Sequence, residues 1–124
     1  IKNVLGKNRL LSTTKTKKKE LLELFARCEF TEAYILNEKD QLIGKIKVND
    51  VMREENEEVS LDRNPLRLNT NESVSEAITK ASSFIGESIP VVDEFNKLVG
   101  VVTEADLFSE YLSVQERISN IEKD

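Results

Sequence analysis

The sequence predicts an α+β, sandwich-like fold in which one small unit occurs twice in tandem. Apolar positions in the second half match those in the first at a fixed offset of 56 residues, the separation of Gly44 and Gly100. Each copy is patterned as a strand, a helix, two strands and a second helix. A copy of this length is too small for a comfortable core of its own. The two copies are therefore expected to pack face to face, with pseudo-two-fold symmetry.

The first copy combines an amphipathic helix with a hairpin. Apolar residues up to Phe25 and Cys28 recur at helical spacing and form one face. Thr14 or Thr16 is expected to cap this helix. Two apolar runs separated by a polar turn predict the hairpin. The predicted elements are an edge strand at 9–12, a helix at 17–28, strands at 33–36 and 42–47, and a short helix at 48–53.

The second copy repeats this pattern. Apolar residues from Val74 to Phe84 recur at helical spacing, and Gly86 is expected to end that helix. Thr70 or Asn71 is expected to cap it. The predicted elements are a new element starting at 65–68, a helix at 73–84, and strands at 89–92 and 98–102.

The repeat sets the expected domain boundaries. The first unit is predicted at 9–56 and the second at 65–112. The segment between them, 57–64, continues an acidic and loosely patterned stretch and is interpreted as a linker. Residues 113–124 carry no Gly or Pro and are predicted to extend the last helix beyond the second unit.

The last helix carries a heptad-like apolar stripe. Leu107, Tyr111, Val114, Ile118 and Ile121 follow one another at spacings of 4, 3, 4 and 3 residues. The stripe covers fewer heptads than a coiled coil needs. Two interpretations stay open: the helix packs along its own domain, or it is an arm that meets a second subunit and makes a homodimer.

Composition excludes several classes of function. The net charge of −5 argues against general binding of nucleic acid, which needs a basic face. The chain has no histidine and one cysteine, Cys28, so Cys/His zinc sites and His-dependent nucleophile pairs are excluded within it. No metal-ligand cluster and no convincing nucleophile–base pair is present, so we expect no enzyme activity. No apolar run approaches the ~20 residues that span a bilayer.

The junction at 97–106, KLVGVVTEAD, is the candidate binding site. A strand runs directly into a helix there, with Thr103 at the expected N-cap and Asp106 three residues later. Helix starts favour anions, so a hydroxyl and a carboxylate beside one can hold a phosphorylated, ribose-bearing ligand. Gly100 would let that ligand approach the backbone. The alternative is purely structural, because Thr-x-x-Asp also resembles a capping box.

These residues resemble a known family. The run Gly100-Val101-Val102-Thr103-Glu104-Ala105-Asp106, preceded by Ser88-Ile89-Pro90-Val91-Val92-Asp93, looks like the signature of a cystathionine-β-synthase (CBS) domain. The first copy has the weaker motif Gly44-Lys45-Ile46-Lys47-Val48-Asn49-Asp50. Two tandem units resemble a CBS pair, the Bateman module, over nearly the whole chain.

The resemblance implies a regulatory module without catalysis that binds an adenine nucleotide (AMP, ADP or ATP) in a cleft between the units. Asp106 would hold ribose hydroxyls and Thr103 would contact phosphate. The backbone of Leu68–Thr70 and the side chains of Ile89 and Pro90 would flank the base. Some such pairs bind nothing, so a structural dimerisation module without nucleotide is the alternative function.

The first copy departs from the family pattern at its motif. Lys47 stands where Thr or Ser is usual, whereas Asp50 is kept. Lys47 either pairs with a phosphate as a point charge or faces away from an unused site. Lys47 and Asp50 therefore define a weaker, first-unit site.

The parent protein is predicted by resemblance alone. The run at 31–50 is similar to the cytosolic pair of ClC-type chloride channels and transporters. Magnesium or other cation transporters and nucleotide-biosynthesis enzymes are the alternatives. A channel or transporter parent implies a cytoplasmic location, at the cytosolic face of a membrane.

Overall fold

The computed structural model describes residues 5, 8–82 and 88–123, and describes no side chain beyond 116. Its elements follow the predicted order in both halves, which confirms the α+β class and the repeated unit. The elements are β1 (Ser12–Thr13), α1 (Lys18–Arg27), β2 (Glu32–Leu36), β3 (Leu42–Lys47), α2 (Val48–Arg53), β4 (Leu68–Asn69), α3 (Val74–Ala81), β5 (Ile89–Val92), β6 (Leu98–Val102) and α4 (Glu104–Lys123).

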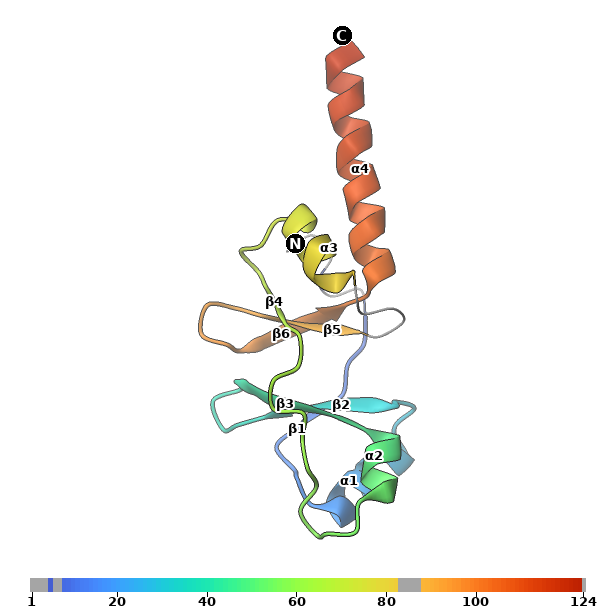
Figure 1. The fold of residues 1–124 in the computed structure, drawn as a ribbon, viewed down its shortest axis with the longest axis vertical. Coiled ribbons are helices and arrows are strands. Elements are labelled where there is room, and N and C mark those ends of the chain that lie inside the picture. The colour runs from blue at the N-terminus through green and yellow to red at the C-terminus, as the bar shows by residue number, and fades with distance from the viewer. Residues whose placement is uncertain (1–4, 6–7, 83–87, 124) are drawn as a thin grey trace. The chain divides into compact units, whose positions relative to one another are not determined.

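The chain divides into two compact units. The first-repeat unit holds Arg9–Leu66 and Phe95–Leu98, and the second-repeat unit holds Arg67–Glu94, Val99–Asp124 and the segment ending at Asn8. One three-stranded sheet has the order β1-β2-β3 and the other β4-β5-β6. Within each unit the two helices lie on one face of its sheet (Figure 1).

The backbone itself repeats at the predicted offset. Strands β1 and β4 occupy equivalent positions, and each pairs in parallel with the next strand, β2 or β5. The N-caps of α1 and α3, Lys17 and Ser73, are also one repeat apart. Among the described residues other than glycine, those with positive φ are Asp40 and Asn96, both at φ 63°, one in each hairpin turn. Asp and Asn tolerate this left-handed conformation better than most side chains do.

The core of the first-repeat unit forms between its sheet and its two helices. Apolar side chains on the inner face of α1 meet those of β2, β3 and α2. The buried cluster is Leu21, Phe25, Ala33, Ile35, Ile46, Val51 and Val59.

The segment expected to be a linker is packed against this unit. Val59 is 6% exposed and belongs to the core cluster. The Val59 N–H donates to Thr16 O at 3.1 Å. Asp62 pairs with Lys45 of β3 in an antiparallel bridge. A Cβ added at Gly44 would come 3.1 Å from both Leu61 Cβ and Asp62 O, so the small residue allows this close approach.

The first-repeat unit also includes the turn residues at 95–98. The Leu42 N–H donates to Asn96 O at 2.9 Å, and Asn96 Nδ2 donates to Leu42 O at 3.0 Å. The Leu98 N–H donates to Asp40 O at 3.2 Å. These turn-to-turn hydrogen bonds place the short segment with the first repeat.

Both cap predictions were wrong. Helix α1 starts at N-cap Lys17 without a side-chain cap bond, and the Thr16 hydroxyl donates to Glu58 instead. Helix α3 is capped by Ser73, whose Oγ accepts from Glu76 N at 3.1 Å, rather than by Thr70 or Asn71. The helix is described as far as Ala81, so the predicted end at Gly86 lies outside the described residues.

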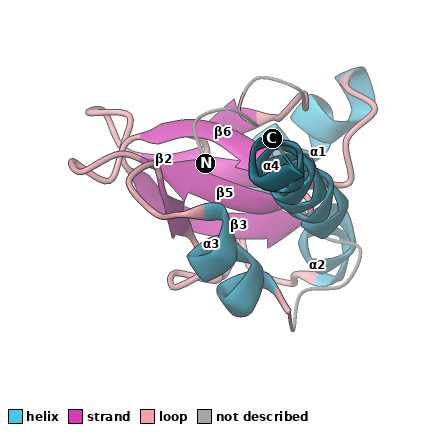
Figure 2. Cartoon of the chain, turned by 90° about the horizontal axis from the view of Figure 1, so that it is seen from above, coloured by secondary structure: helices cyan, strands magenta, loops and turns pink. Residues whose placement is uncertain are grey.

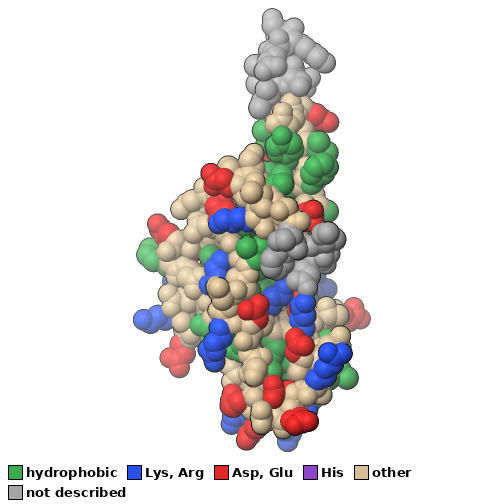
Figure 3. Space-filling view, viewed as in Figure 1, with side chains coloured by type: hydrophobic (Ala, Val, Ile, Leu, Met, Phe, Trp, Pro, Cys, Tyr) green, Lys and Arg blue, Asp and Glu red, His purple; other side chains and the backbone are tan. Residues whose placement is uncertain are grey.

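Helix α4 is continuous through Lys123, as predicted from the absence of Gly and Pro. It is the long helix seen nearly end-on in Figure 2. Leu107 is fully buried, whereas Tyr111 and Val114 of the same stripe are half-buried. Apolar side chains are also exposed along the described part of α4 (Figure 3), where Phe108 and Leu112 are 56% and 47% exposed. None of the helices described has the length and apolar character needed to cross a bilayer.

Candidate functional site

The predicted site lies where β6 passes into α4. Thr103 Oγ1 accepts the backbone N–H of Asp106 at 3.1 Å. In return, Asp106 Oδ2 accepts the backbone N–H of Thr103 at 3.0 Å. This is the reciprocal pattern of a capping box, with Asp in the place of Glu or Gln. The structural interpretation of Thr-x-x-Asp is therefore correct, and it leaves a fixed carboxylate at the start of a 20-residue helix.

A third side chain joins this pair from far away in the sequence. Asn8 Nδ2 donates to Asp106 Oδ2 at 2.6 Å and lies 3.4 Å from Val101 O. Sequence analysis missed Asn8, because no local pattern links it to a residue 98 positions away. The Asp106 carboxylate thus already accepts from a side-chain amide and a backbone amide.

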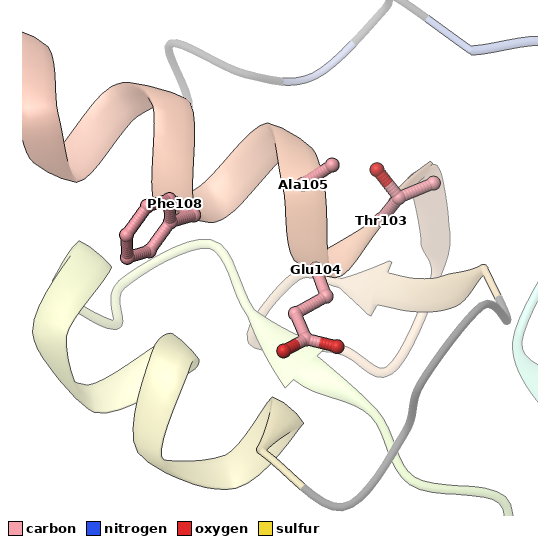
Figure 4. A pocket seen from close by; sticks show the side chains of 4 residues that line it. All are labelled: Thr103, Glu104, Ala105 and Phe108. Atoms are coloured by element: carbon pink, nitrogen blue, oxygen red, sulfur yellow. The ribbon is translucent and has the colours of Figure 1, made fainter.

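A cavity of about 480 Å³ opens beside the junction. Among the described residues, those that line it are Thr103, Glu104, Ala105 and Phe108. Thr103 directly precedes α4, and the other three belong to the first turns of that helix (Figure 4). Its volume lies within the range of about 300–1,000 Å³ that is usual for small-molecule sites. Of the residues predicted for this site, only Thr103 is among the described residues that line the cavity.

The remaining predicted residues of this site come from neighbouring strands. Leu68 pairs with Val91 across β4 and β5, and the Thr70 N–H donates to Val92 O at 3.0 Å. The side chains of Leu68 and Ile89 are fully buried. Pro90 of β5 and Gly100 of β6 are buried as well. The structure thus places Leu68, Ile89, Pro90 and Gly100 in one sheet, with Thr70 directly after β4. The contact of these residues with a nucleotide stays a prediction.

The first-unit site is also assembled. Lys47 and Asp50 both line a cavity of about 210 Å³ at the β3–α2 junction. This volume is below the usual range for a complete small-molecule ligand. Unlike Thr103, Lys47 makes no side-chain cap bond although it occupies the N-cap of α2. Ser60 and Asp62 complete the lining from the segment expected to be a linker, and sequence analysis missed both.

Glu54 organises the loop that follows α2. Its carboxylate accepts the backbone N–H groups of Asn56 at 3.2 Å and Ser60 at 3.4 Å, and the Asn56 side-chain amide at 3.1 Å. The backbone hydrogen bond from Asn56, followed by that from Ser60, lowers the pKa of Glu54 below its ordinary value of 4.5. These bonds stabilise the ionised form. Glu54, Asn56 and Ser60 line a separate cavity of about 420 Å³, which Asp50 also borders.

An ion pair with a buried lysine lies close to the cavity beside Lys47. Lys45, which lines the cavity and is 7% exposed, has its Nζ 3.2 Å from Glu32 Oε2 and 5.8 Å from the centre of the Tyr34 ring. Its charge is thus already matched by a carboxylate. Among the described residues, no group of three or more Cys, Asp or Glu is arranged to hold a metal ion.

Comparison with known proteins identifies the class of protein. Residues 57–113 match the CBS domain family, so the second half of the chain is a CBS domain. The chain as a whole has the fold of a CBS domain pair, as the sequence resemblance predicted. No match was found among curated protein sequences.

Three similar structures illustrate this fold. The CBS domain pair of protein MJ0100, in complex with 5′-methylthioadenosine and S-adenosyl-L-methionine, is 22% identical with a TM-score of 0.66, over 91% of this chain and 95% of that one. The cytosolic domain of the Mg²⁺ channel MgtE, in complex with ATP, is 21% identical with a TM-score of 0.68, over 81% and 44%. CBSX2 in complex with AMP is 17% identical with a TM-score of 0.64, over 88% and 90%.

Proposed function

We propose that this chain is a regulatory module that senses an adenine nucleotide, AMP, ADP or ATP, at the β6–α4 junction. The observation that carries the proposal is the cavity beside Thr103, in the half of the chain that is a CBS domain. The three similar structures are complexes with different ligands that share an adenosine group. That shared group supports an adenosine-containing ligand here.

The residues of the junction suit the parts of such a ligand. The Asp106 carboxylate accepts hydrogen bonds, which ribose hydroxyls donate. The first turn of α4 offers backbone N–H groups and the positive end of a helix dipole to phosphate, with the Thr103 hydroxyl beside them. Leu68, Thr70, Ile89 and Pro90 would flank the base, and Gly100 would permit close approach. Lys47 and Asp50 form a second, weaker site.

Regulation requires that the nucleotide bind two arrangements of the protein with different affinity. The activity of the parent protein would depend on which of the two arrangements the nucleotide stabilises. The Mg²⁺ channel among the similar structures favours a channel or transporter, with this module at the cytosolic face. The proposal of a ClC-type chloride channel as the parent rests on the sequence resemblance at 31–50 alone. Membrane-spanning segments in the same polypeptide would support a membrane parent. A catalytic domain in that polypeptide would indicate an enzyme parent instead.

The test is a titration with AMP, ADP and ATP, followed by melting temperature and calorimetry. A ligand at 100 times its dissociation constant adds about 2.7 kcal/mol to stability. Asp106→Asn keeps the shape of the side chain and removes its charge, so we expect weaker binding. Asp40→Asn makes the same change at an exposed carboxylate in the first hairpin turn, outside both candidate sites, and as the matched control it should bind as wild type does. No shift with any nucleotide, or equal shifts in both variants, contradicts the proposal.

The second candidate is a dimerisation module without nucleotide. It is favoured by Phe108 and Leu112, two exposed apolar side chains one turn apart on α4. Sedimentation should then give twice the monomer mass. Truncation after Ser113 or Phe108→Ser should lower it, and a monomer at high concentration refutes this candidate.

A further inference from the structure

An acidic side chain lines the cavity of the proposed nucleotide site. Glu104 is half-buried at the first position of α4, directly after Thr103. The other described residues of the lining, Thr103, Ala105 and Phe108, carry no charge. The charge that the described lining places beside the ligand is therefore negative, although the phosphates of the proposed ligands are negative as well.

The first copy shows that this helix start does not require a carboxylate. Val48, one repeat before Glu104, is likewise the first residue of its helix, and it packs against the core of the first-repeat unit. An acidic residue in the first turn also stabilises a helix through the helix dipole. That contribution is the same for every ligand, whereas an effect on binding depends on the charge of the ligand.

The donors at this helix start suit a single phosphate group. The Glu104 and Ala105 N–H groups belong to the first turn, where no earlier helical carbonyl can accept them. The Thr103 hydroxyl accepts the Asp106 N–H and keeps its own proton to donate. These donors match the oxygens of one phosphate. The remaining side chains of the described lining, Glu104 and Phe108 among them, donate no hydrogen bond.

Additional phosphates would meet the charge of Glu104. Figure 4 shows its carboxylate directed away from the Thr103 hydroxyl, so a phosphate bound at that hydroxyl does not have to contact it. Both groups nevertheless line one cavity of about 480 Å³. Because the Debye length is about 8 Å at physiological ionic strength, salt screens the carboxylate only partly across such a space. Each further phosphate charge in the cavity therefore adds repulsion.

We propose that Glu104 is a specificity-determining residue that makes this site select AMP over ADP and ATP. The single phosphate of AMP uses the donors of the helix start. Each further phosphate adds charge near Glu104 without gaining a donor from the described lining. The inference rests on the proposed function and names the ligand of that same site. A parent protein would then respond to AMP in the presence of ATP.

The test is calorimetric titration of AMP, ADP and ATP into wild type and Glu104→Gln, at low salt and without Mg²⁺. Wild type should bind AMP about tenfold more tightly than ATP, equivalent to about 1.4 kcal/mol. Glu104→Gln keeps the shape of the side chain and removes its charge, so it should tighten ATP binding more than AMP binding and close this gap. Glu76→Gln, at an exposed first-turn glutamate of α3, is the matched control and should keep the wild-type ratio. Added salt should narrow the gap in wild type.

A second variant tests the same charge from a neighbouring position. Phe108 is 56% exposed and one turn after Glu104, so Phe108→Lys places a cation beside that carboxylate. It should tighten ATP binding more than AMP binding. Melting temperature without ligand shows whether each variant is folded, and Phe108→Lys decides the question if Glu104→Gln is not.

Two kinds of result overturn the inference and leave the proposed function standing. One is ATP binding as tight as AMP binding in wild type, or a wild-type affinity ratio in the folded variant that decides the question. The other is weaker binding of ATP by Glu104→Gln when Mg²⁺ is added, because Glu104 would then hold a metal ion on the phosphates. If wild type binds none of the three nucleotides, the proposed function fails first and the selectivity fails with it.

Discussion

Asp106 has a structural role that can be measured without any ligand. Its carboxylate accepts the Thr103 N–H at 3.0 Å and the Asn8 amide at 2.6 Å, and it lies in the first turn of α4. A hydrogen bond to a charged group contributes about 1.5–3 kcal/mol, and a favourable helix dipole adds about 0.3–1 kcal/mol. Because Asp106 is half-buried, we expect Asp106→Ala to lower the free energy of unfolding by about 2 kcal/mol.

The repeat supplies the control for this measurement. Asp50 is the equivalent residue of the first copy, but it is exposed and follows Lys47, which makes no side-chain cap bond. Asp50→Ala should cost less than about 0.5 kcal/mol, as most surface substitutions do. Thr103→Ala should fall between the two, at about 1 kcal/mol for the loss of an N-cap. Urea unfolding at neutral pH without nucleotide gives all three values. Equal costs for Asp106→Ala and Asp50→Ala would refute the capping argument.

Three further predictions concern the first-repeat unit. Glu32→Gln should cost about 2 kcal/mol in urea unfolding, because it leaves the 7% exposed Lys45 without its carboxylate at 3.2 Å, and adding Lys45→Met should recover part of that loss. Val59→Ala should cost about 2 kcal/mol, whereas a freely solvated linker would show no change; Val99→Ala, at a 44% exposed valine, is the control. The folded-state pKa of Glu54 is lowered, so its stabilising contribution is present above the unfolded pKa of about 4.5 and is lost as pH falls through the folded value. Melting curves from about pH 6 to about pH 3 should therefore fall less steeply for Glu54→Gln than for wild type, and parallel curves would contradict this.

The repeat made most of the fold predictable from sequence. Strand and helix positions follow from apolar spacing, which is a local property, and a fixed offset lets one copy check the other. The equivalent turns at Asp40 and Asn96 show that the offset is kept in the backbone conformation. The caps were less predictable, since several candidate residues stand before each helix. Thr16 donates to Glu58 instead, and Ser73 caps where Thr70 or Asn71 was expected.

Only those residues of the candidate site that lie close together in the sequence could be predicted. Thr103 and Asp106 are three residues apart, so their pairing follows from the spacing of a helix start. Asn8 and Asp62 reach their sites from distant parts of the chain, and no periodicity links them to those sites. The acidic stretch around Val59 did not reveal its packing, because the two apolar residues Val59 and Leu61 among charges form too short a pattern to identify.

The two copies have diverged at the feature that would bind a ligand. In the second copy, the side chains of Thr103 and Asp106 each accept the backbone N–H of the other residue. The cavity beside them, of about 480 Å³, lies within the usual size range of small-molecule sites. In the first copy Lys47 places a positive charge at the start of α2, where the helix dipole disfavours it. The cavity of about 210 Å³ beside Lys47 is lined in part by Ser60 and Asp62 of the 57–64 segment, and Val59 of the same segment belongs to that unit's core. A Lys at this position suits an anionic group alone, such as a phosphate, and not a ribose. The positive charge at Lys47 is therefore the reason that we propose one nucleotide per chain, at the second copy.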